Sequence, residues 1–209
     1  ERRDNAGQRA LLADSAYHID ILRAPSGGVQ ALMASWDFGG FVFFEHFAVD
    51  PACRNGGIGG QMLDALLARF DKPACLEAEL PETELAARRI GFYERHGFTV
   101  NADYPYFQPA LTPGGSPIPL HLLTTGGVRT PAELRAIETL VHTRVYGKTP
   151  AAMVSQKTDS QHASARKGQG RAFLYLEGET MQNYCPGRPP LPPSVMVTSS
   201  LPGSSTATV

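Results

Sequence analysis

The sequence predicts an α/β fold with a mixed sheet, in which an antiparallel meander of strands leads into a βαβα unit. Short runs of β-branched and aromatic residues alternate with Gly- and Pro-containing turns early in the chain. A glycine-rich loop then joins one run to a segment whose apolar residues have helical spacing, and a second strand and helix follow. This order of elements is typical of parallel strands joined by a crossover helix.

The predicted meander consists of strands over residues 17–22, 29–36 and 41–49. Turn residues separate the strands, with Pro25 and Gly27 in the first turn and Gly39 in the second. Strict alternation along the third strand would place five side chains on one face. These are Phe41, Phe43, Glu45, Phe47 and Val49.

Two helices and a strand complete the predicted βαβα unit. The first helix covers residues 58–70, because its apolar residues recur at intervals of three and four. Residues 73–80 form a short strand that we expect to lie parallel to residues 41–49. The second helix runs from about Glu82 and ends at Gly97, since glycine commonly terminates helices.

Downstream, short strands over residues 99–101 and 120–125 flank a proline-rich loop that contains residues 104–109. Thr130, Pro131 and Glu133 form a capping box that opens a helix reaching about Tyr146. Residues 149–209 are rich in Ser, Thr, Pro and Gly and have few apolar residues, so we expect a largely disordered tail. The predicted organisation is one domain over residues 1–148 followed by this tail.

Composition excludes several classes of protein. With 42% hydrophobic residues and a net charge of −1 over 209 residues, the chain has no charge excess that predicts a nucleic-acid or membrane surface. No apolar stretch approaches the ~18 residues of a membrane span. Cys53, Cys75 and Cys185 are scattered, and no Cys/His cluster has zinc spacing. We therefore expect a reducing, cytoplasmic location and no bound metal.

The glycine loop between the third strand and the first helix predicts an anion site. Its glycines allow the chain to turn through positive φ and bring backbone N–H groups against a ligand, and the following helix adds its dipole. A phosphate or pyrophosphate fits such a site. Two nucleotide motifs fit less well, because no Gly-Lys-Ser/Thr is present and a Rossmann fingerprint needs glycine where Met62 stands.

The spacing Arg54-x-x-Gly57-x-Gly59 resembles the acyl-CoA pyrophosphate loop of the GNAT superfamily of N-acyltransferases. A second segment, residues 87–98, resembles another motif of that superfamily, in which a helix carrying Phe-Tyr ends shortly before Gly-Phe. The resemblance covers about residues 1–148. Since a strand and helix precede the meander in this superfamily, we expect residues 1–12 to end a helical region and the chain to lack its first strand and part of its first helix.

The resemblance implies residues that bind acetyl-CoA as a co-substrate. Backbone N–H groups around Phe47 and Val49 would bind the pantetheine arm and polarise the thioester carbonyl. The side chain of Arg54 and the backbone N–H groups of the rest of the loop would hold the pyrophosphate. The loop consists of Arg54, Asn55, Gly56, Gly57, Ile58, Gly59 and Gly60.

The resemblance also implies direct attack of an amine on the thioester, which requires a general base because such amines are mostly protonated at neutral pH. Glu45 and Glu77 are the leading candidates, with His46 and Glu79 behind them. Many relatives carry a glutamate where this chain has Phe43. Tyr93 is the candidate for protonating the departing thiolate.

Three functions remain open from the sequence. The first is a cytoplasmic N-acetyltransferase that acts on a small molecule or a protein amine, with a homodimer as one possible assembly. The second is a non-catalytic acyl-CoA-binding or protein-interaction module on the same fold, which the absence of a glutamate at Phe43 favours. The third, a nucleotide-binding oxidoreductase, is motivated only by the glycine loop.

Overall fold

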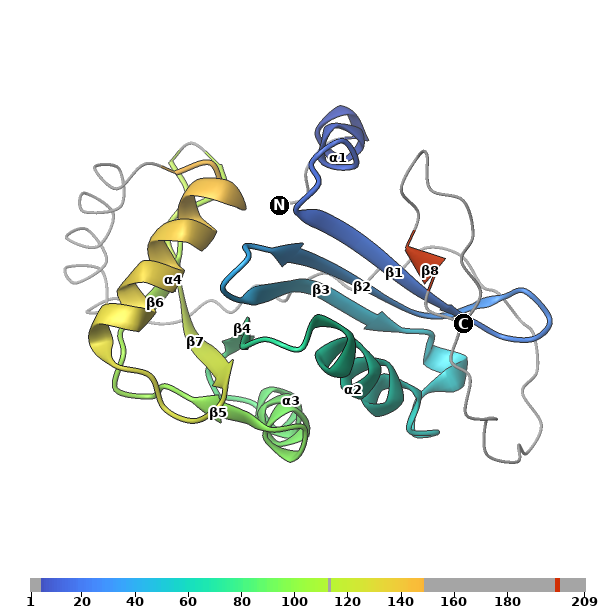
Figure 1. Cartoon of the computed structure of the whole chain (residues 1–209). Coiled ribbons are helices and arrows are strands. Elements are labelled where there is room, and N and C mark those ends of the chain that lie inside the picture. Colours follow the sequence, from blue (N-terminus) through green and yellow to red (C-terminus); the bar gives the residue numbers. More distant parts are fainter. Residues whose placement is uncertain (1–4, 113, 149–197, 200–209) are drawn as a thin grey trace.

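The computed structural model describes residues 5–112, 114–148 and 198–199 (Figure 1). An eight-stranded sheet has the order β5-β7-β4-β3-β2-β1-β8, with β6 paired to β7 outside this path. The elements in chain order are α1 (Asn5–Leu11), β1 (Tyr17–Arg23), β2 (Val29–Asp37), β3 (Val42–Val49), the 3-10 turn η1 (Pro51–Cys53), α2 (Ile58–Phe70), β4 (Ala74–Glu79), α3 (Glu84–Arg95), β5 (Phe98–Val100), β6 (Tyr106–Gln108), β7 (Ile118–Thr125), α4 (Pro131–Arg144) and β8 (Thr198–Ser199).

The predicted fold class is confirmed. Strands β1, β2 and β3 form an antiparallel meander, and α2 connects β3 to the parallel strand β4. Strand β7 then pairs antiparallel with β4 and carries the short strands β5 and β6 on its other edge. The predicted βαβα unit is therefore β3-α2-β4-α3, placed in the middle of a mixed sheet.

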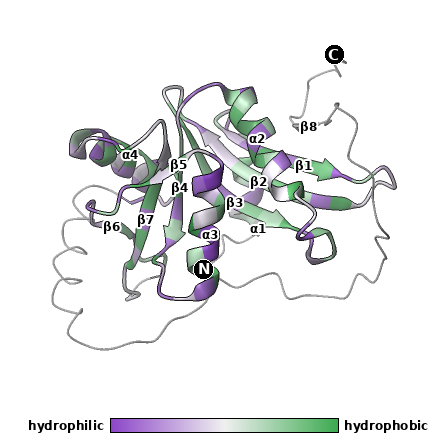
Figure 2. Cartoon of the chain, turned by 90° about the horizontal axis from the view of Figure 1, so that it is seen from below, coloured by the Kyte–Doolittle hydropathy of each residue, from purple (hydrophilic) through white to green (hydrophobic). Residues whose placement is uncertain are grey.

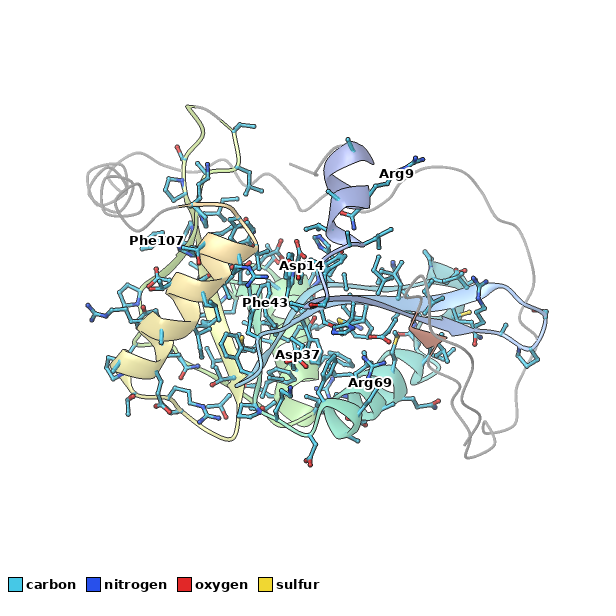
Figure 3. All side chains as sticks on the ribbon, turned by 45° about the horizontal axis from the view of Figure 1, so that its top comes forward. Arg9, Asp14, Asp37, Phe43, Arg69 and Phe107 are labelled. Carbon is cyan, nitrogen blue, oxygen red and sulfur yellow. The ribbon has the colours of Figure 1, made fainter. Side chains whose placement is uncertain are left out.

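The sheet has a hydrophobic core on each face. Helices α2 and α3 cover one face, where Phe44, Leu63 and Ile90 are buried together. Helix α4 covers the other face, where Val141 packs against Trp36 and Phe43 (Figures 1 and 3). Figure 2 shows that β1 and β7 combine hydrophobic and hydrophilic residues, as expected of antiparallel strands.

Helix termini follow the local sequence. Thr83 caps α3 by accepting a hydrogen bond from the backbone of Ala86, and Gly97, with a φ of 84°, follows its C-terminal end. Thr130 and Glu133 form the predicted capping box of α4, which ends at Arg144, two residues before the predicted limit. Helix α2 differs, because its N-cap Gly57 provides no side-chain hydrogen bond.

The predicted face of the third strand is wrong. Cross-strand pairing of β2 with β3 shifts between Ala34 and Ser35, so that Glu45 is the extra residue of a β-bulge. Phe43 consequently packs on the α4 face, whereas Phe47 packs on the α2 face. Alternation within β3 is interrupted at the bulge, and the five residues do not share a face.

One further prediction is corrected. The proline-rich loop over residues 104–109 contains strand β6, because Tyr106 and Gln108 pair with Leu120 and Ile118 of β7. The segment predicted as a tail contributes β8, which pairs with β1 at Asp20 and Ile21. The remainder of residues 149–209 lies outside the described residues, and the predicted domain boundary remains a prediction.

Candidate active site

Strands β3 and β4 pair only at their beginnings. Their parallel register includes Val42, Phe43 and Phe44 of β3, and the last pair joins Phe44 to Leu76. Beyond this point β3 continues beside β2, and β4 continues beside β7. The two central strands therefore diverge at Glu45, where the bulge directs β3 away from β4. Divergence creates a place where a ligand can lie between two strand ends.

The glycine loop joins the diverging end of β3 to α2. Asp50 caps the short turn η1, and the chain then adopts positive φ at Asn55 (62°) and Gly57 (76°). The Arg54 side chain is anchored by its Nε, which donates to the Val49 carbonyl at 3.3 Å. The first N–H groups of α2 receive no side-chain cap from Gly57. This uncapped first turn has the donors and the dipole that an anionic group requires.

Close packing fixes the position of this loop against the strand. A Cβ atom on Gly59 would lie 3.3 Å from Val49 Cγ2 and 3.6 Å from Phe47 Cζ. The start of α2 thus lies directly on the end of β3. Phe47 and Val49, predicted to contact the pantetheine arm, and the loop from Arg54 to Gly60, predicted to hold the pyrophosphate, form one continuous surface.

Glu77 of β4 is held by three donors that come from β6 and from the chain after α4. The hydroxyl of Tyr106 donates to one carboxylate oxygen, and the hydroxyl of Tyr146 donates to the other at 2.5 Å. Gln108 Nε2 lies 3.4 Å from the same oxygen as Tyr146. Loss of water around the carboxylate raises the pKa of Glu77 to about 7, although both tyrosine hydrogen bonds lower it. The side chain nevertheless keeps a partly exposed surface.

Glu45 lies near Glu77 across the diverging strands. Its carboxylate accepts a hydrogen bond of 2.7 Å from Trp36 Nε1 and lies 3.4 Å from His46 Nε2. A charge on Glu45 raises the pKa of Glu77, whereas a charge on His46 lowers it. The bulge explains why Glu45 and His46 lie together near Glu77, because it turns these two consecutive residues of β3 towards the α4 face. The structure therefore brings three of the four predicted base candidates together.

Glu79, the fourth candidate, has a different environment. Its carboxylate forms an ion pair of 2.8 Å with Arg89 of α3. This contact joins β4 to α3, so Glu79 has a structural partner and does not belong to the cluster around Glu77.

Tyr93 lies on α3 among aromatic side chains. Its ring contacts Phe92 and Phe98, with centroids 5.2 and 5.8 Å away. Burial raises the pKa of the Tyr93 hydroxyl, although Arg89 partly opposes this shift. Tyr93 is consequently protonated at neutral pH, as a proton donor must be.

Sequence analysis missed the donors that surround Glu77. Tyr106 and Gln108 lie in the segment predicted as a loop, and Tyr146 was expected only to end a helix. The alternation of Tyr106 and Gln108 about Phe107 was the available signal, since alternate residues of a strand share a face.

The described residues provide neither a metal site nor a membrane-spanning helix. Among residues 5–112, 114–148 and 198–199, no group of three or more His, Cys, Asp or Glu side chains is arranged to hold a metal ion. No helix in this described part of the chain is long and apolar enough to cross a membrane.

Comparisons with known proteins show similarity to acetyltransferases. The model of the acetyltransferase (GNAT) domain family matches residues 17–100. A protein from Bacteroides thetaiotaomicron, described as an acetyltransferase of the GNAT family, is 35% identical, with a TM-score of 0.65. That match covers 71% of this chain and 84% of the other.

Two further solved structures are less similar to this chain. The ribosomal-protein-S18-alanine N-acetyltransferase of Escherichia coli is 20% identical, with a TM-score of 0.41, over 59% of this chain and 77% of its own. A Bacillus subtilis acetyltransferase in complex with CoA is 12% identical, with a TM-score of 0.42, over 58% of this chain and 84% of its own. A search of curated protein sequences found no match.

Proposed function

Because the chain belongs to the GNAT acetyltransferase family, we propose that it transfers the acetyl group of acetyl-CoA to a primary amine by direct attack. The observation that carries this proposal is Glu77, a carboxylate with a pKa of about 7 that lies where the two central strands diverge. A general base works best when its pKa lies near the operating pH. Glu77 meets this condition, whereas an ordinary glutamate with a pKa of about 4.3 does not.

The glycine loop supports the choice of acyl-CoA as co-substrate. The first turn of α2 lacks a side-chain cap, and Asn55 and Gly57 hold the positive φ angles that the loop needs. In the proposal, Arg54 and the N–H groups from Asn55 to Gly60 bind the pyrophosphate. Backbone N–H groups near Phe47 and Val49 bind the pantetheine arm and the thioester oxygen.

The reaction requires three proton transfers. Glu77 takes a proton from the ammonium group, and the amine nitrogen then attacks the carbonyl carbon of the thioester and loses its second proton to solvent. The C–S bond breaks when the tetrahedral intermediate collapses, and the Tyr93 hydroxyl, later reprotonated by solvent, protonates the thiolate. This last transfer is uphill, because an ordinary tyrosine with a pKa of about 10 is a weaker acid than a thiol with a pKa of about 8.5, and burial raises the pKa of Tyr93 further. The ordinary values differ by about 2 kcal/mol, and a hydrogen bond formed with the thiolate offsets this cost.

Glu45 is the second candidate for the base. Its position beside Glu77 allows it either to accept the proton itself or to attract a cationic acceptor. A glutamine variant of each residue separates these roles. The residue whose variant loses the acidic limb of the kcat/KM profile is the base. The activity of that variant recovers at high pH, because the amine loses its proton unaided.

The experiment that tests the proposal measures free thiol released from acetyl-CoA by the full chain with a panel of amines. We expect turnover with at least one amine, and a loss of about 10²-fold or more in Glu77→Gln near neutral pH. Glu79→Gln is the matched control, because Glu79 lies on the same strand but pairs with Arg89. It should retain most activity.

Two results would contradict the proposal. Binding of CoA without turnover of any amine would favour the non-catalytic acyl-CoA-binding module, which the apolar, fully buried Phe43 also favours. Absence of CoA binding would overturn the assignment of the glycine loop. The proposal includes a cytoplasmic location, consistent with the reduced state of Cys53 and Cys75.

A further inference from the structure

The carboxylate of Glu77 is stabilised by neutral groups. Two tyrosine hydroxyls and one glutamine amide point at its two oxygens. No lysine or arginine among the described residues hydrogen-bonds or pairs with it. A buried carboxylate normally pairs with a cation, because a full opposite charge best offsets the loss of water.

Asp20 shows the ordinary arrangement in the same protein. Its fully buried carboxylate receives two hydrogen bonds from the guanidinium of Arg69, at 2.5 and 2.7 Å. That pair joins β1 to the last turn of α2. The donors to Glu77 orient its carboxylate without a full positive charge. This arrangement suits a group that must gain and lose a proton.

The donors to Glu77 come from late in the chain. Tyr106 and Gln108 lie on β6, and Tyr146 lies two residues beyond α4. Gln108 also donates to the Tyr146 hydroxyl at 2.7 Å, so the two segments hold each other as well as the carboxylate. All three residues lie outside the segment, residues 17–100, that matches the family model.

We propose that Tyr106 and Tyr146 are positioning residues for Glu77. Their hydroxyls fix the orientation of the carboxylate and stabilise its charged form without a lysine or arginine partner. This inference rests on the proposed function of Glu77 as the general base. Both hydroxyls act as donors at neutral pH, because burial raises the pKa of each tyrosine well above its usual value and the charge on Glu77 raises it further.

Other titratable groups face this cluster from every element packed against it. The Tyr106 ring lies 5.5 Å from the ring of His142, which lies 6.2 Å from the ring of Tyr146. Among the described residues, the titratable groups that interact with this cluster or belong to it are Glu45 and His46 from β3, Cys75 from β4, Tyr106 from β6, Glu138 and His142 from α4, and Tyr146 after it. Each of them is unchanged in the variants below, apart from the tyrosine that is replaced.

The test is a carbon-detected NMR titration of the Glu side-chain carboxyl groups in the full chain without substrate. Glu77→Gln identifies the Glu77 signal. Removing a hydrogen bond to the charged form raises a carboxyl pKa. We therefore expect Tyr106→Phe and Tyr146→Phe each to move the Glu77 midpoint upwards by about one pH unit. The acidic limb of kcat/KM should move in the same direction by a similar amount.

Tyr104→Phe is the matched control. Tyr104 lies two residues before Tyr106, but its hydroxyl donates to Glu138 and not to Glu77. This variant loses the same atom from the same region and should leave the Glu77 midpoint unchanged. An unchanged midpoint in both Tyr106→Phe and Tyr146→Phe would overturn the inference, as would an equal shift in Tyr104→Phe.

The titration does not depend on turnover. A shifted midpoint in an inactive protein would support the positioning role while refuting the proposed reaction. Turnover that is lost in Glu77→Gln but keeps the same pH profile in both tyrosine variants would support the reaction and refute the positioning role.

Discussion

The imidazole of His96 occupies the space that a side chain on Gly60 would need. A Cβ atom on Gly60 would lie 2.8 Å from His96 Cε1, closer than carbon atoms approach without strain. The ring has little freedom to move, because its Nδ1 lies 2.6 Å from an oxygen of Asp64 and its face packs on Phe92 at 4.8 Å. The C-terminal end of α3 thus fixes the first turn of α2, where we propose that the pyrophosphate binds.

We therefore expect Gly60→Ala to destabilise the protein. Alanine improves helix propensity by about 1 kcal/mol, but overpacking costs about 1–3 kcal/mol, so the clash should dominate. Urea unfolding measures the difference. Gly56→Ala is the control, since a Cβ there meets only the Cys53 carbonyl at 3.6 Å.

The double variant Gly60→Ala/His96→Ala distinguishes the clash from a general helix effect. If the imidazole causes the loss, the two substitutions will be strongly non-additive, and the double variant will be more stable than the sum predicts. Additive losses would show that the ring moves aside at little cost.

The raised pKa of Glu77 also predicts a pH dependence of stability. The folded-state pKa of about 7 lies above the unfolded value of 4.5, so folding favours the protonated form. Stability from this group is present in full below pH 4.5 and is lost as the pH rises through about 7. The difference between the two values corresponds to about 3 kcal/mol.

Glu77→Gln removes this dependence, since glutamine does not ionise. Relative to the natural protein, the variant should be more stable at pH 8.5 than at pH 5, by up to about 3 kcal/mol. Urea unfolding at both pH values provides the comparison, and other carboxyl groups cancel because both proteins contain them. An equal difference at both pH values would contradict the raised pKa.

Local sequence patterns predicted the elements that local forces determine. The positive φ at Gly57, the capping box at Thr130 and the helix end at Gly97 each depend on neighbouring residues, and each was predicted. The bulge at Glu45 could not be predicted from β3 alone, because its residues alternate regularly and only the pairing with β2 inserts the extra residue.

The environment of Glu77 was unpredictable for a related reason. Tyr146 lies 69 residues from Glu77 in sequence, and Tyr106 lies 29 residues from it. Only the arrangement of β6 and α4 beside β4 brings these groups together. Sequence identified Glu77 and Glu45 as the leading candidates among four, and the neutral hydrogen-bond donors of Glu77 distinguish it from Glu79.

The predicted domain boundary leads to a truncation experiment. Ending the chain after Lys148 removes β8, whose described residues pair with β1 at only two positions. We expect the melting temperature to fall by only a few degrees and CoA affinity to stay the same, because the two helix-covered cores lie within residues 11–146. A large fall in melting temperature would show that the predicted boundary after Lys148 is wrong.

The final prediction concerns the Tyr93 hydroxyl. Tyr93→Phe keeps the ring contacts with Phe92 and Phe98 and removes only the proton donor. If Tyr93 protonates the leaving thiolate, kcat should fall by about 10²-fold with little change in CoA affinity, because the lost interaction acts in the transition state. Steady-state kinetics and calorimetry with CoA measure the two quantities. A leaving thiol of lower pKa needs less help from a proton donor. The fall in kcat should therefore be smaller with a thioester of a more acidic thiol. Activity close to that of the natural protein would instead assign Tyr93 to packing between α3 and β5.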